Sequence, residues 1–311
     1  MLIDPSMARE MVHGVRMQMG RVLAAVVVVG AVVSGCGGPE QAGSAVIVGD
    51  TSVSLESVQA QLSDALKRIP PAGLQQDTPA AVARDIVTNE ILHGLVERQA
   101  TARSVTVTDA DVDAFIAQQG GTQSLLQNSI LDEAGLRQQV RDNLLAAGLA
   151  KRAVAGLQVT ADLVAATTKD EAVADAQKLA VGGSAADALF TNPQTSQRGI
   201  VYTAATTPGI ASTVVFGTPV GGTVYFQPNP QQATWIVFRV TGKRTDAPSD
   251  PAAVSQISQD QLVSIGQRTL QPVADRLGVR VNPRYGVWDP IALRVVAADQ
   301  VSGGLLPAAA G

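Results

Sequence analysis

The sequence predicts an α+β fold: a helical domain, completed by a helix near the C-terminus, that carries a small inserted α/β domain. Apolar residues recur at three- and four-residue intervals over most of residues 54–157. After residue 158 the chain changes to short β-branched and apolar segments separated by glycine and proline. Phe115 is the only aromatic residue before residue 190, so the others indicate a second core around a sheet.

The first 35 residues are predicted to be a signal peptide. Arg16 and Arg21 flank the start of an apolar run over residues 22–33, which has the length of a signal-peptide core and is too short to span a bilayer. The run ends in Val33-Ser-Gly-Cys36, which resembles the lipobox of bacterial lipoproteins. We therefore expect cleavage before Cys36, acyl chains on its thiol, and anchoring at the outer face of the cytoplasmic membrane. The alternative is a plain secretory signal followed by a chance cysteine, but a lone free thiol in an exported protein would need another explanation.

Composition limits the partners of the mature chain. Residues 36–44 are small and polar, and they form the predicted lipidated tether. The whole chain carries 23 basic and 27 acidic residues without a basic cluster, which argues against nucleic-acid binding. Cys36 is the only cysteine, so the fold depends on its core and not on disulfides.

Capping residues and apolar periodicity predict the elements of the helical domain. Ser54 is a predicted N-cap, and Thr108 with Asp111 resembles a capping box. A short hairpin comes first, and helices follow it: hairpin 45–53, then helices over 54–69, 80–103, from Thr108 to Gly120, and 133–156.

The second half is predicted to be a small sheet followed by a returning helix. Strands are expected over 158–165, 199–203, 222–226 and 234–241, with the last two forming a hairpin and Thr168 capping a helix after the first. The aromatic residues of this part alternate along strands and are expected in its core. A single helix is predicted over 252–277, and the end of the chain, 298–311, is expected to be disordered.

This order of elements resembles the SurA-type and PrsA-type exported foldases, in the form of an actinobacterial lipoprotein. The resemblance is carried by Val46-Ile-Val-Gly-Asp-Thr-Ser-Val-Ser54, by Ile91-Leu-x-x-Leu-Val-Glu-x-Gln-Ala100 and by Thr234-Trp-Ile-Val-Phe-Arg-Val-Thr-Gly-Lys243. It implies a helical chaperone-like domain over 45–157 plus 250–290, and an inserted, degenerate parvulin-like domain over 158–246.

The resemblance also implies a function: a membrane-tethered extracytoplasmic chaperone that binds unfolded exported proteins. Binding is expected on apolar surface between the N-terminal helices and the helix over 252–277. The residues assigned to this surface are Ile86, Leu92, Val96, Phe115, Leu262 and Ile265.

Catalysis is not expected. Active parvulins resemble one another in placing one histidine on the first strand of the domain and one on the last; here the first strand reads Val159-Thr-Ala-Asp-Leu-Val164, and Trp235 stands on the last. His93, the only histidine after the signal peptide, is predicted to be a solvated helix residue, on the face that carries Asn89 and Glu97. Without clustered histidines or cysteines, no metal site is predicted, and no motif indicates a cofactor.

Two other functions remain open from sequence. A dedicated envelope scaffold would use the same surface to dock one fixed partner. An active peptidyl-prolyl isomerase would need a catalytic site that the sequence does not reveal.

Overall fold

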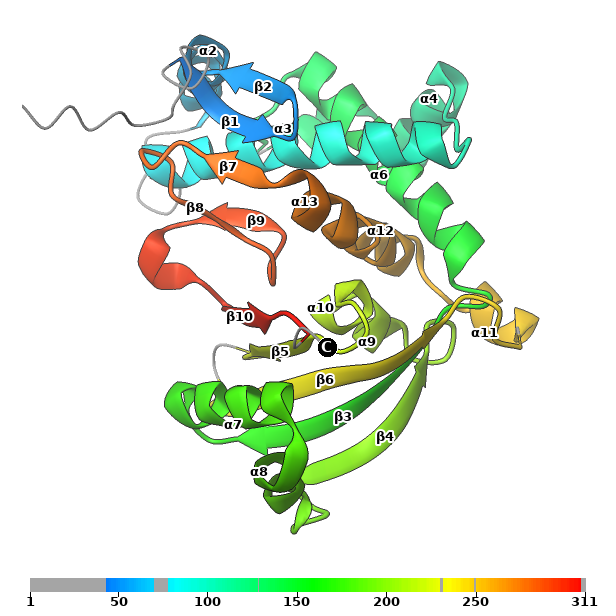
Figure 1. Ribbon diagram of the computed structural model, residues 1–311. Coiled ribbons are helices and arrows are strands. Elements are labelled where there is room, and N and C mark those ends of the chain that lie inside the picture. The colour runs from blue at the N-terminus through cyan, green and yellow to red at the C-terminus, as the bar shows by residue number, and fades with distance from the viewer. Residues whose placement is uncertain (1–42, 70–77, 128, 230–231, 249, 309–311) are drawn as a thin grey trace, which may run out of the picture. The chain divides into compact units, whose positions relative to one another are not determined.

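The computed structural model describes residues 43–308, apart from 70–77, 128, 230–231 and 249 (Figure 1). These residues belong to one compact unit, Gly38–Gly311. The predicted signal peptide, Cys36 and most of the predicted tether lie outside the described residues. None of the described helices is long and apolar enough to cross a membrane.

The N-terminal hairpin belongs to a three-stranded sheet. Strands β1 (Ser44–Val48) and β2 (Thr51–Ser54) form the predicted hairpin, and β7 (Val279–Val281) pairs with the other edge of β1. Val46 lies opposite Val53 on one side and Val281 on the other. Strand β7, from late in the chain, therefore completes the sheet that the N-terminal hairpin begins.

The predicted helices of the first half agree with their predicted boundaries to within a few residues, and one short helix over 122–126 was not predicted. The Ser54 hydroxyl accepts a hydrogen bond from the backbone of Ser57, and Thr108 with Asp111 forms the predicted capping box. The helices are α2 (Leu55–Arg68), α3 (Pro79–Ala102), α4 (Asp109–Gln118), α5 (Thr122–Leu126) and α6 (Glu133–Ala153). Helices α2, α3 and α6 share a core that contains the fully buried side chains of Val58, Val87, Ile91 and Leu95, whereas α4 and α5 pack with α6 in a separate core.

The predicted helix over 252–277 is three helices: α11 (Pro251–Ser255), α12 (Gln259–Arg268) and α13 (Gln271–Leu277). Ser258 and Gln261 form a capping box that starts α12 afresh. Pro272 stands in the first turn of α13, where its ring and missing N–H prevent continuation of α12. The apolar periodicity continues across both breaks, which is why the sequence predicts one helix.

Helix α12 packs closely against α6 (Figure 1). A Cβ at Gly266 would lie 1.8 Å from the carbonyl oxygen of Ala146, so only glycine allows the two backbones to come this close. Leu262 and Ile265 of α12 are buried in the core that this contact helps to form.

The second half of the chain forms a five-stranded sheet in the order β10-β5-β6-β3-β4, where β10 is Gly303–Leu306 near the C-terminus, β5 is Thr223–Phe226 and β4 is Ser196–Thr203. The long strands β3 (Gln158–Ala166) and β6 (Trp235–Arg244) pair at its centre, and β5 and β6 form the predicted hairpin. The remaining elements are α7 (Lys169–Val181), α8 (Gly183–Asp187), η2 (Ala188–Phe190), β4 (Ser196–Thr203), α9 (Pro208–Ala211), α10 (Val214–Gly217) and β5 (Thr223–Phe226).

Each face of this sheet is packed. Helix α7 lies against β3, β5 and β6, and its Leu179 joins Val164 and Val237 in one core (Figure 1). Phe226 and Phe238 belong to another core, which includes residues of α6, α9, α10 and α12. The prediction that aromatic residues of this part form a core is confirmed for these two and for Phe216.

The end of the chain is ordered, so the prediction of a disordered tail over 298–311 is wrong for the residues that the structure describes. After β8 (Val287–Asp289), β9 (Arg294–Val296) and η3 (Ala298–Gln300), strand β10 (Gly303–Leu306) pairs with β5. A Cβ at Gly303 would lie 2.1 Å from the carbonyl oxygen of Tyr225. Two glycines in a strand of four residues remove the side-chain signal for a strand, and the same two glycines permit the pairing.

Candidate functional site: a groove between α2, α3 and α6

A groove of about 440 Å³ lies between the helices α2, α3 and α6. Helix α2 contributes one wall, α3 the floor and one flank, and the start of α6 the other flank. Gln267 of α12 and Leu270, just before α13, reach the same groove. Residues from the N-terminal helices and from the segment of α12 and α13 thus line the same groove.

The floor of the groove is apolar. Ile86, Val96 and Leu270 are buried there, and Leu92 is half-buried. Ala65 and Ala146 also line it, and their short side chains leave room above the floor. An apolar side chain seated on this floor would lose contact with water, which is favourable at about 25 cal/mol per Å² buried.

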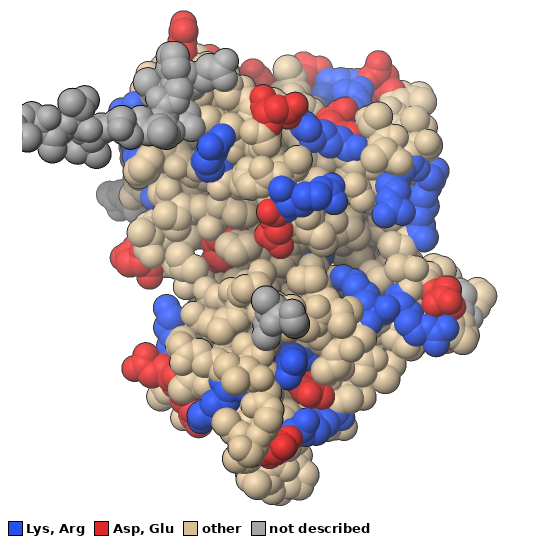
Figure 2. Space-filling view, viewed as in Figure 1, with Lys and Arg blue, Asp and Glu red and all other residues tan. Residues whose placement is uncertain are grey.

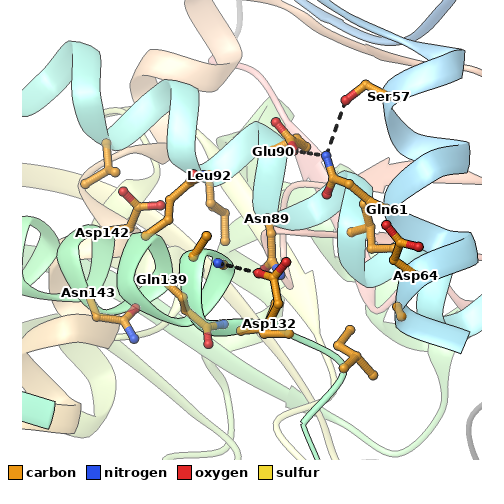
Figure 3. A pocket seen from close by; sticks show the side chains of 18 of the residues that line it. Ser57, Gln61, Asp64, Asn89, Glu90, Leu92, Asp132, Gln139, Asp142 and Asn143 are labelled. Carbon is orange, nitrogen blue, oxygen red and sulfur yellow. Dashed lines mark hydrogen bonds between the residues drawn. The ribbon is translucent and has the colours of Figure 1, made fainter. Parts of the chain in front are cut away.

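The rim of the groove is rich in side-chain amides. Gln61 donates to Glu90 Oε1 over 2.7 Å (Figure 3). Within the described residues, the amides of five other lining residues make no hydrogen bond to the protein: Asn89, Gln138, Gln139, Asn143 and Gln267. Each carries two donors and an acceptor, so together they offer both kinds of partner to a bound polar group.

Carboxylates outnumber basic groups among the residues that line the groove. Four acidic residues face a single arginine: Asp64, Glu90, Asp132 and Asp142 against Arg68. Asp132 caps α6 through Gly135 N at 2.8 Å, and Arg68 lies 3.5 Å from Asp132, which connects α2 to the start of α6. Lys67, through its hydrogen bond, lowers the pKa of the exposed Asp64 carboxyl. The groove is therefore negatively charged at neutral pH.

His93 is not the solvated residue that the sequence predicts. Its Nδ1 lies 3.0 Å from Oδ1 of Asp142, which joins α3 to α6 beside the groove. The side chains are 33% and 17% exposed respectively. The hydrogen bond that the His93 ring donates to the Asp142 carboxylate raises the pKa of His93, against the opposing effect of burial. Helical periodicity placed His93 opposite the apolar stripe of α3, but α6 covers part of that face.

The predicted contact residues fall in different places. Ile86, Leu92 and Val96 line the groove. Phe115 packs in a separate small core of α4 and α6, and Leu262 and Ile265 are buried in the core below α12. The amide rim was not predicted from the sequence. Gln139 and Asn143 are four residues apart on the polar face of α6, and Asn89 is on the polar face of α3, so their positions could have indicated it.

The described strands of the five-stranded sheet carry no histidine, and therefore no parvulin-type histidine pair. Trp235 pairs with Ala166 across β3 and β6 and lies 6.4 Å from the ring of Tyr225. Asp162, buried on β3, accepts a hydrogen bond from Gly199 N at 2.9 Å. These polar and aromatic groups hold strands together.

Charges on the molecular surface are mixed. Figure 2 shows basic and acidic side chains interspersed on the face that it displays.

Among the comparisons with known proteins, only the comparison with solved structures gives matches, and those named below are foldases. No family profile matches the chain, and no curated protein gives a significant match. Solved structures that resemble it include the peptidylprolyl isomerase PrsA of Bacillus anthracis, at 17% identity and TM-score 0.26, over 63% of this chain and 99% of that one. The foldase protein PrsA of Lactococcus lactis is 14% identical with TM-score 0.28, over 77% and 95%. The foldase protein PrsA of Streptococcus pneumoniae is 14% identical with TM-score 0.24, over 76% and 94%. At TM-scores this low, the function of the chain has to be argued from its own residues.

Proposed function

We propose that this protein is a membrane-tethered extracytoplasmic chaperone that holds extended segments of unfolded exported proteins without catalysis. The observation that carries the proposal is the groove itself: an apolar floor of Ile86, Leu92 and Val96 beneath a rim of unengaged amides. The resemblance of the sequence to exported foldases supports the same function.

The chemistry of the groove suits a polypeptide of varied sequence. Amide side chains can pair with backbone N–H and C=O groups, which every client carries, while the floor accepts apolar side chains. Such contacts select for extended, unfolded backbone and only weakly for sequence. The excess of carboxylates at the rim favours segments that carry lysine or arginine and predicts binding that weakens with salt.

Tethering is part of the proposal and rests on Cys36. Acyl chains on Cys36 would hold the groove near the site where exported chains emerge from the membrane. The test is fractionation of cells that express the chain with Cys36→Ser: the protein should move from the membrane to the soluble fraction. A variant that remains in the membrane would contradict lipid anchoring at this residue.

Binding is tested with the chain starting at Gly38 and a permanently unfolded, alkylated secreted protein, by fluorescence anisotropy. We expect saturable binding that other unfolded chains compete for. The double variant Gln139→Ala with Asn143→Ala should weaken this binding several-fold, because the rim then lacks two of the amides that pair with the backbone of the client. Gln118→Ala, an exposed glutamine on α4 outside the groove, is the matched control and should bind as the wild type does.

Two results would count against a general chaperone. Absence of binding to any unfolded chain would contradict it and favour a scaffold that docks one partner. Binding that the rim double variant leaves unchanged would place the client surface elsewhere.

A further inference from the structure

Three side chains with metal-ligating atoms converge beside the groove. His93 and Glu97 are one helical turn apart on α3, and Asp142 faces them from α6. One ligand atom from each lies within 4.8 Å of the others, and His93 Nδ1 lies 3.0 and 3.1 Å from the two oxygens of Asp142.

The charges around His93 are unbalanced. Glu90 and Glu97 act on His93 together with Asp142. Three carboxylates around one imidazole leave a net negative charge whether the ring is neutral or protonated. Within the described residues, no lysine or arginine forms an ion pair with Glu97 or Asp142. A divalent cation would balance this charge better than a proton on His93 does.

The donor set points to a class of ion. Imidazole nitrogen and carboxylate oxygen are ligands of Zn²⁺ and neighbouring transition metals, whereas Mg²⁺ and Ca²⁺ prefer oxygen alone. Ligand atoms about 2.0–2.2 Å from a tetrahedral Zn²⁺ lie about 3.3 Å apart. The His93–Asp142 pair is already close to that separation, and Glu97 is exposed and free to turn toward it.

We propose that His93, Glu97 and Asp142 form a binding site for a divalent transition-metal ion, with remaining positions open to water. The site bridges α3 and α6, and Asp142 also lines the groove. A bound ion would therefore fix the spacing of two groove walls. The sequence did not predict this site because the ligands come from two helices that are far apart in the chain.

The test uses the chain from Gly38, freed of metal with a chelator and titrated with Zn²⁺ by calorimetry. This chain contains a single histidine, His93, and no cysteine, so few competing ligands remain. We expect one Zn²⁺ per chain and a shift of the one imidazole signal in NMR spectra. Co²⁺ in place of Zn²⁺ should give a visible absorption band of a nitrogen- and oxygen-ligated ion.

Substitutions show whether Zn²⁺ is bound by these three ligands or only attracted by the negative charge around them. His93→Gln, Glu97→Gln and Asp142→Asn should each weaken Zn²⁺ binding at least ~10-fold. Glu90→Gln is the matched control, because Glu90 contributes charge but is not in the ligand cluster; it should weaken binding only about two- to threefold. Circular dichroism checks that each variant is folded.

Three results would overturn the proposal: no binding tighter than millimolar, an unshifted His93 signal at saturation, or an effect of Glu90→Gln equal to that of the ligand variants. None of these results bears on client binding, which is measured without added metal.

Discussion

His93 Nδ1 lies 3.0 Å from Asp142 Oδ1, and this contact joins α3 to α6 next to the floor of the groove. Both side chains are partly withdrawn from water. The groove is therefore held at one flank by a polar contact that depends on the protonation of a single ring. Whatever occupies the groove, its two helices are coupled through this pair.

The pair makes stability depend on pH in the metal-free protein. Asp142 raises the pKa of His93 above the unfolded value of about 6.5, with smaller contributions from Glu97 and Glu90. The stabilisation is therefore fully present below about pH 6.5 and is lost as pH rises through the folded pKa. We expect up to ~1 kcal/mol, because the pair is partly exposed.

Urea unfolding with chelator present, over about pH 5 to 8.5, checks this prediction. At the lowest pH of this range the wild type should have a higher free energy of unfolding than Asp142→Asn. The difference should become smaller as the pH rises. A difference that is constant with pH would show that the contact does not depend on a charged ring.

The five-stranded sheet and the helices packed on it should not catalyse prolyl isomerisation. The central strands of this sheet carry Trp235 and Asp162 in structural roles, and its strands contain no histidine. A proline-containing peptide should isomerise at its uncatalysed rate, with a relaxation of tens to hundreds of seconds, at any concentration of the chain. An active parvulin serves as the positive control, and a rate that rises in proportion to chain concentration would refute the prediction.

Arg268 should be a major stabilising residue. Its buried guanidinium donates to Gln271 Oε1 at 2.9 Å, to the carbonyl oxygens of Pro290 at 3.1 Å and Ile291 at 2.9 Å, and to that of Ser212 at 3.3 Å. Burial lowers its pKa to about 10, so it stays charged at neutral pH. Arg268→Met leaves these acceptors without their donor and should cost about 3 kcal/mol in urea unfolding.

The exposed Arg276 on α13 provides the comparison, because it is an arginine of the same part of the chain. Arg276→Met should change stability by less than about 0.5 kcal/mol. Equal effects of the two substitutions would mean that the buried hydrogen bonds of Arg268 contribute little.

The strand at the end of the chain should depend on Gly303. Gly303→Ala places a methyl group 2.1 Å from the carbonyl oxygen of Tyr225, so β10 must shift or detach from β5. We expect a loss of about 1–3 kcal/mol and faster hydrogen exchange in the peptide that covers β5. Gly209→Ala, where no atom lies within 4 Å of the added carbon, should leave both quantities almost unchanged.

Local chemistry in the sequence was enough to predict most of the longer helices and strands. The caps at Ser54, Thr108 and Thr168 are formed by side chains that bond to backbone three residues away, so the information lies within one turn. The strands over 158–165 and 234–241 were recognisable from β-branched and aromatic residues. The α+β class and the change of character near residue 158 followed from these local patterns.

What the sequence by itself determined is therefore where the chain forms helices and strands, because those signals act over a few residues. Only the tertiary structure decided which distant elements meet: β10 on β5, Gly266 against Ala146, and Asp142 beside His93. Such contacts depend on backbone approach and on groups far apart in the chain, and a periodic pattern carries no information about them. The amide rim and the His93–Glu97–Asp142 cluster exist only once α3 and α6 are packed together.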